Sequence, residues 1–279
     1  MAVKAKDSAL IWSRDIKSEF QVQLDQTWDG YSQSPVIAGN LLLIDIGGGE
    51  NKSLGAFDVN TGKTVWTCHT ENHPTYSTPL KINSIGQKQI VFNADRLIVS
   101  ISPSGEILWK YRWGRAYEGR EFENKIANPV FISPDKIFVS AIFDIGSSLL
   151  QMKNDGSAIT VNELWNTKVM QNHITTSVHV GKYIYGFDVT TLKCLEIKTA
   201  KITWAKRRLG RGSLIYADKK LIVLSERGTL ILLKANHKKY EELCSYKVFD
   251  HRVWTPLSLA NGLLFLRSSK ELVCINLKK

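Results

Sequence analysis

Two histidines are the side chains in this sequence best suited to proton transfer near neutral pH. His73 and His173 lie in polar segments between apolar runs, and imidazole is the side chain whose ordinary pKa falls nearest to neutrality. A general base also needs a nucleophile or a carboxylate within hydrogen-bond reach, and neither flanking sequence supplies one. We therefore predict no catalytic residues and keep acid–base chemistry at these histidines as the minor alternative.

Motifs for other kinds of chemistry are missing from the sequence. No GxSxG, HExxH or P-loop spacing occurs. The cysteines are far apart, so we predict neither a zinc site nor a disulfide framework, and no metal-binding residues. The triple glycine at 47–49 follows a predicted strand and precedes no helix, which indicates a loop and not a phosphate site. The four cysteines are Cys68, Cys194, Cys244 and Cys274.

The chain of 279 residues has a formal net charge of +11, which raises the question of an anionic partner. The basic residues are scattered, and the small group at 206–208 with Arg211 is among the few clusters. We therefore interpret the charge as a solvated surface and do not expect nucleic acid as a partner. No apolar run is long enough to span a membrane, and the first residues do not resemble a secretory signal.

The chain contains a repeated sequence motif, called the repeated phrase below. Residues 54–66, LGAFDVNTGKTVW, read as a strand, a tight turn and a second strand that ends in Trp66. Related phrases end at Trp109, Trp165 and Trp204, and the last half of the phrase ends at Trp12. The intervals of 39 to 56 residues are near the length of a four-stranded propeller blade. We predict an all-β fold, a β-propeller of four-stranded antiparallel blades.

The repeat predicts a single domain, residues 1–279, with six blades and no helix. The last unit lacks a fourth strand, and we expect the N-terminal segment 9–16 to supply it and close the ring. We expect the repeated tryptophans to wedge between neighbouring blades, because a buried indole removes roughly 150–250 Å² from water. These docking residues are Trp12, Trp66, Trp109, Trp165 and Trp204. The blades are expected at about 30–70, 71–114, 124–168, 172–208, 210–249 and 252–279.

The segments that precede the first strand of each unit should line the central funnel of a propeller. Their aromatic, amide, imidazole and guanidinium groups suit an anionic or peptide-like partner. The alternative is that these groups satisfy loop backbone or hold water in the channel. The candidate contacts are Trp28, Tyr31, His73, Tyr76, Asn128, Asn172, His173, Arg211 and Trp254, accompanied by Ser32, Ser77, Asn124, Ser213 and Arg252.

The phrase DVNTGKTVW and its echoes resemble the Trp-docking motif of propellers with pyrrolo-quinoline quinone (PQQ) repeats. The resemblance covers essentially the whole chain. The stretches GYSQSPVIAGN, MQNHITTSVHVGKYIYGF and LGRGSLIYADKKLIVLSERGTL resemble bacterial members related to outer-membrane assembly lipoproteins. Such members have eight blades and an export signal, and this chain resembles their last six blades. The resemblance implies a periplasmic or exported protein, whereas the missing signal leaves the cytoplasm open.

The resemblance also implies a function, and the sequence departs from one version of it. Quinone enzymes of the family carry an adjacent Cys-Cys pair and a calcium-binding set, and no Cys-Cys pair occurs here. PQQ and calcium are thus expected by resemblance only. We predict a non-catalytic scaffold that binds a protein or peptide, with a small-molecule ligand as an option. The alternatives are a PQQ-dependent dehydrogenase and a binder of anionic polymer or nucleic acid.

Overall fold

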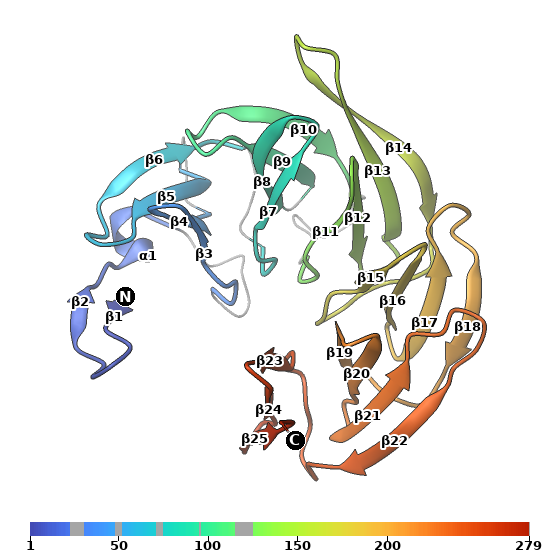
Figure 1. The fold of residues 1–279 in the computed structure, drawn as a ribbon. Helices are drawn as coiled ribbons and strands as arrows, with labels where there is room; N and C mark the ends of the chain where they lie inside the picture. The colour runs from blue at the N-terminus through green and yellow to red at the C-terminus, as the bar shows by residue number, and fades with distance from the viewer. Residues whose placement is uncertain (23–30, 48–51, 71–74, 95, 115–124, 279) are drawn as a thin grey trace. The chain divides into compact units, whose positions relative to one another are not determined.

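The computed structural model describes residues 1–22, 31–47, 52–70, 75–94, 96–114 and 125–278 (Figure 1). Trp28, His73 and Asn124 lie outside the described residues. The chain divides into two compact units, Met1–Ile137 with Leu150–Asn162 and Phe138–Leu149 with Glu163–Lys279.

The first unit contains two antiparallel meanders of four strands each. Within each, the strands follow one another in sequence order, as short Gly- and Asn-containing turns allow. The first sheet consists of β3 (Val36–Ala38), β4 (Leu41–Asp45), β5 (Leu54–Asp58) and β6 (Thr64–Cys68). The second consists of β7 (Leu80–Ser84), β8 (Gln87–Asn93), β9 (Leu97–Ile101) and β10 (Ile107–Arg112).

A third sheet has the same consecutive order, with β11 (Val130–Ile132), β12 (Lys136–Ala141), β13 (Gly146–Asn154) and β14 (Ile159–Thr167). Ile159 begins a nine-residue strand, because the alternating residues after it continue the hairpin with β13.

The second unit holds two further four-stranded meanders and one sheet of three strands. The fourth sheet is β15 (Val178–Val180), β16 (Tyr183–Asp188), β17 (Thr191–Glu196) and β18 (Ile202–Lys206). The fifth is β19 (Ser213–Ala217), β20 (Lys220–Leu224), β21 (Thr229–Lys234) and β22 (Glu242–Lys247). The sixth is β23 (Ser258–Ala260), β24 (Leu263–Arg267) and β25 (Leu272–Asn276). The all-β prediction is confirmed.

The N-terminal segment differs from the single strand expected over 9–16. Strand β2 (Leu10–Trp12) pairs with β1 (Ala2–Val3), and a one-turn helix, α1 (Ile16–Glu19), follows. The expectation of no helix was therefore wrong. The local cause is Asp15, an N-cap whose carboxylate accepts a hydrogen bond from the Ser18 backbone N–H at 3.2 Å. Among the described residues no helix is long and apolar enough to cross a membrane.

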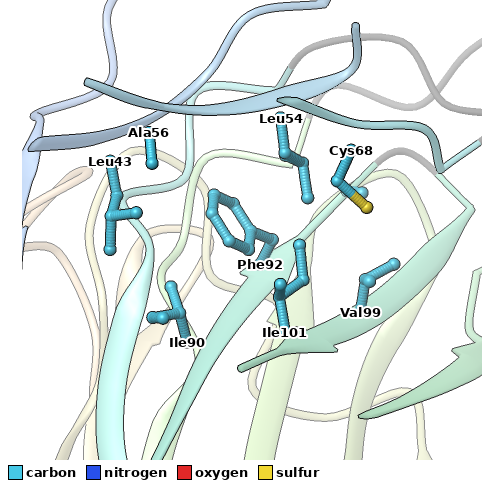
Figure 2. Close-up of a cluster of buried hydrophobic side chains, with 9 residues drawn as sticks. Leu43, Leu54, Ala56, Cys68, Ile90, Phe92, Val99 and Ile101 are labelled. Carbon is cyan, nitrogen blue, oxygen red and sulfur yellow. The ribbon is translucent and has the colours of Figure 1, made fainter. Parts of the chain in front are cut away.

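Alternation along β4 assigns its side chains to two cores. Leu43 packs with Ala56 and Phe92 in a buried cluster between the first and second sheets, where the labelled side chains point toward one another (Figure 2). Ile44, on the opposite face, packs against a second cluster that includes Phe57. Period-two alternation thus gives the sheet two apolar faces, which a stacked blade requires.

Four tryptophans place their indoles on the turn between the last two strands of the sheet that follows them in sequence. Trp66 donates from Nε1 to the carbonyl of Pro103 at 3.1 Å, and Trp165 and Trp204 bind the corresponding turns of the fourth and fifth sheets. Trp12 does the same to Val59 at 2.9 Å. Gly62 has a φ of +70°, and a Cβ there would lie 2.6 Å from the ring of Trp12, so this turn requires glycine.

Trp109 is held in a different way. Its side chain is only 5% exposed, and its Nε1 donates at 2.8 Å to Oε1 of Gln89 in its own sheet. Gln89 Oε1 also accepts from Ser100 Oγ at 2.8 Å, so the indole completes a buried network.

The cysteines occupy both buried and exposed positions. Cys194 is buried and lies opposite Trp204. Cys274 lies on the exposed face of β25. All four cysteines are free thiols.

Candidate binding site

The candidate residues lie in the strand-starting loops, defined here as the segments that immediately precede β3, β7, β11, β15, β19 and β23. Each loop stands at the end of its sheet where the first strand begins. Of the nine predicted contacts, Trp28 and His73 fall outside the described residues. The structure describes Tyr31, Tyr76, Asn128, Asn172, His173, Arg211 and Trp254.

In the first unit the described candidate residues are hydrogen-bonded to backbone groups of the protein itself. The hydroxyl of Tyr31 donates to the carbonyl of Ile46, and burial raises the pKa of Tyr31. Asn128 Oδ1 accepts from the backbone N–H of Thr78 at 2.7 Å. The backbone N–H of Tyr76 donates to the carbonyl of Lys125 at 3.1 Å. These contacts join loops to one another, which is the structural alternative considered from the sequence.

Asn172 in the second unit is also hydrogen-bonded within the protein. Its side chain is buried, its Nδ2 donates to the carbonyl of Phe187 at 2.8 Å, and its Oδ1 accepts from Ser177 Oγ at 2.8 Å. Both ends of the amide are therefore used to hold the loop before β15.

The structure brings Arg211 and Trp254 together with Glu226 and Arg252. His173 lies within electrostatic reach of Arg211 and Glu226. We call the set His173, Arg211, Glu226, Arg252 and Trp254 the Trp254 cluster. Trp254 Nε1 donates to Glu226 Oε1 at 2.6 Å, and the backbone N–H of Arg211 donates to Glu226 Oε2 at 3.0 Å. Glu226 thus joins the loop before β19 to the loop before β23.

Two guanidinium groups lie beside the indole of Trp254. The Cζ atom of Arg252 is 4.0 Å from the ring centroid, and that of Arg211 is 5.7 Å away. Such cation–π contacts contribute about 0.5–1 kcal/mol at exposed sites. Trp254 remains 39% exposed. The result is a preorganised aromatic and cationic surface that is open to solvent.

Electrostatics set the protonation of the two titratable members. Partial burial would raise the pKa of Glu226, but the hydrogen bonds from Arg211 and Trp254 and the charges of the two arginines lower it overall. Burial lowers the pKa of His173, and Arg211 lowers it further against an opposing effect of Glu226. At neutral pH we therefore assign an ionised Glu226 and a neutral His173.

The cluster combines charged groups with an exposed indole. It can therefore contact a polypeptide that has a polar group next to an apolar side chain. Within the described part of the protein no group of three or more His, Cys, Asp or Glu residues could hold a metal ion. Four members of the cluster are among the residues predicted from the sequence, namely Arg211, His173, Arg252 and Trp254, and Glu226 is not. The feature of the sequence that could have indicated Glu226 is its position, a carboxylate in the loop directly after the buried strand β20.

Solved structures identify the fold as a β-propeller. The BamB structure from Moraxella catarrhalis aligns with a TM-score of 0.68 and 14% identity, covering 98% of this chain and 74% of that one. The β-propeller domain of Cps50 (Swd1) from Myceliophteria thermophila aligns with a TM-score of 0.57 and 10% identity, covering 89% and 83%. At these identities the likeness concerns the fold alone.

The sequence assigns the chain to a family within that class. Residues 1–206 match the family described as outer membrane protein assembly factor BamB, and the chain belongs to this family. The resemblance to PQQ-like propellers is thereby confirmed. A comparison with curated proteins found no match.

Proposed function

We propose that this chain is a non-catalytic propeller scaffold that binds a protein partner during outer-membrane protein assembly, in the bacterial envelope. The family description supports the process. The observation that carries the binding site is the Trp254 cluster, an exposed indole stacked by arginine and fixed by Glu226. Trp and Arg are the residue types most enriched among those that dominate protein interfaces.

A quinone-dependent activity finds little support in the residues present. The described residues offer no group of three or more His, Cys, Asp or Glu for a metal ion, and the sequence has no adjacent cysteine pair. The sequence therefore lacks the adjacent cysteines that the resemblance implies beside the quinone, and we derive no catalytic step.

Site-specific photo-crosslinking tests the proposed binding site. A benzophenone amino acid replaces Asp250, whose side chain is 92% exposed four residues before Trp254, so the cluster itself stays intact. The matched control replaces Tyr216, an exposed aromatic residue beside the β19–β20 turn at the other end of its sheet. In living cells we expect one adduct with a protein of outer-membrane assembly from position 250 and none from position 216. No adduct from position 250, or the same adduct from both, would contradict the proposal.

We further propose that six sheets close into a ring, with β2 as the fourth strand of the last sheet. Trp12 binds the β5–β6 turn as the tryptophans of fourth strands bind theirs. The last sheet has three strands. In the first and fourth sheets Trp66 lies opposite Ala56 and Trp204 opposite Cys194. The same register in the last sheet would make Cys274 the partner of Trp12.

Thiol crosslinking tests this closure. The variant Ser13→Cys, with Cys244→Ser to remove the other exposed thiol, is treated with a short bis-maleimide at low protein concentration. We expect a crosslink between residues 13 and 274 within one chain, because both positions are exposed and adjacent in the proposed register. Crosslinks between separate chains only, or none, would favour a longer assembly such as the eight-bladed alternative.

A further inference from the structure

The Trp254 cluster has one positive charge more than its carboxylate neutralises. Arg211 and Arg252 both lie against Trp254, and Glu226 is the acid hydrogen-bonded within the cluster. Both oxygens of Glu226 already accept hydrogen bonds, from Trp254 Nε1 and the Arg211 backbone. The cluster therefore carries a single uncompensated charge, which matches a monoanion.

Two buried nitrogen atoms of the cluster have no hydrogen-bond partner among the described residues. They are Nε of Arg211 and Nδ1 of His173. Most buried polar groups in proteins are paired, and an unpaired one costs about 1–3 kcal/mol. Arginine Nε only donates, so the partner that it lacks is a hydrogen-bond acceptor.

The guanidinium group of Arg252 is held in place without using its hydrogen-bonding edge. Its Cζ lies 4.0 Å from the ring centroid of Trp254, and its side chain makes no hydrogen bond to any residue that the structure describes. A stacked guanidinium presents a planar set of donors that fits the two oxygens of a carboxylate. The stacking on Trp254 therefore orients Arg252 before a ligand arrives.

We propose that the Trp254 cluster binds a carboxylate of the partner polypeptide, either a chain-terminal α-carboxylate or an Asp or Glu side chain. This inference rests on the proposed function and adds its ligand chemistry. Arg252 binds the two oxygens, and Arg211, whose side chain is half-buried, supplies a further donor from Nε after a small movement. An apolar side chain next to the carboxylate packs on the exposed indole of Trp254. A doubly charged phosphate exceeds the single positive charge of the site.

Peptide titrations of the full chain, followed by the ¹⁵N-labelled indole resonance of Trp254, test the proposal. The probes are acetyl-Gly-Gly-Phe with a free carboxylate, the same peptide as an amide, acetyl-Gly-Glu-Phe-amide and inorganic phosphate. We expect one or both carboxylate peptides to bind at least about tenfold more tightly than acetyl-Gly-Gly-Phe-amide. The peptide that binds identifies the source of the carboxylate.

Variants assign the effect to the stacked arginine. Arg252→Ala should lower the affinity for the carboxylate peptide about tenfold and abolish the preference over the amide, whereas Arg252→Lys should lose part of it. Lys238→Ala removes one positive charge from the β21–β22 turn and should change the affinity less than about twofold.

Equal binding of acid and amide, an unaffected Arg252→Ala variant, or tighter binding of phosphate would each overturn the carboxylate assignment. None of these results would remove a crosslink from position 250, so the proposed scaffold function is tested separately. Because Arg252 is exposed, its variants are expected to unfold at the same temperature as the wild type, and this is measured alongside.

Discussion

Replacing Trp109 with alanine is expected to lower the free energy of unfolding by about 3–5 kcal/mol. The indole is almost fully buried, and its removal leaves a cavity in the second sheet and deletes the hydrogen bond to Gln89. Urea unfolding followed by circular dichroism measures the loss. A cost below about 1 kcal/mol would contradict the buried placement of this residue.

Two companion variants separate the contributions to this loss. Trp109→Phe keeps most of the apolar volume and removes the N–H donor, so we expect a smaller cost. Trp66→Ala should also cost less than Trp109→Ala, because Trp66 is only partly buried and rests on the turn at Gly105. The same cost for both alanine variants would show that burial does not set the ranking.

The second large effect is a pH dependence of stability that we assign to Asp45. This carboxyl is buried, and its Oδ2 accepts from the backbone N–H of Thr75 at 3.1 Å. Burial raises the pKa of Asp45 to about 7 from an ordinary value of 3.8, against smaller lowering effects of backbone hydrogen bonds. The folded protein therefore holds this proton more tightly than the unfolded chain does.

Because the pKa of Asp45 is higher in the folded state, protonation of Asp45 adds to the free energy of unfolding at low pH. This contribution is lost as the pH rises. The contribution is complete below about pH 4 and is lost by about pH 7, with a total of at most about 4 kcal/mol. Asp45→Asn keeps an acceptor for Thr75 but cannot ionise. We therefore expect this variant to gain stability relative to the wild type between pH 5 and pH 8, as measured by urea unfolding at both values.

The exposed Asp7→Asn variant serves as the control and should follow the wild type at both pH values. If Asp45→Asn shows the same pH slope as the wild type, Asp45 is not the group responsible. A relative loss of stability at pH 8 would mean that the ionised carboxylate is favoured in the folded state, contrary to this account.

The fold was largely predictable because its signals are local. Alternation around Leu43 and the turn glycine at Gly62 specify strands and hairpins within a few residues. The N-terminal segment was harder to predict, since the pairing of β2 with β1 depends on residues outside the repeat and α1 depends on the cap at Asp15. One turn of helix is too short to leave a periodic pattern.

The site was predictable only in outline. The position before each first strand was enough to name Arg211 and Trp254 as candidates, but not to separate Asn172, whose amide is used within the protein. Glu226 was missed because it lies 28 residues from Trp254 in sequence and meets it only through packing of neighbouring sheets. Hydrophobic periodicity predicts strands and helices, but it does not predict which loops of different sheets come into contact.

The affinity of the crosslinked partner for purified Trp254→Ala and wild-type protein tests the central claim most directly. The matched control is Tyr216→Ala, because Tyr216 is 41% exposed and Trp254 is 39% exposed. We expect Trp254→Ala to weaken binding at least about tenfold, as truncation of a central interface tryptophan does, and Tyr216→Ala less than about twofold. Wild-type affinity in the Trp254→Ala variant would contradict the claim that this cluster binds the partner.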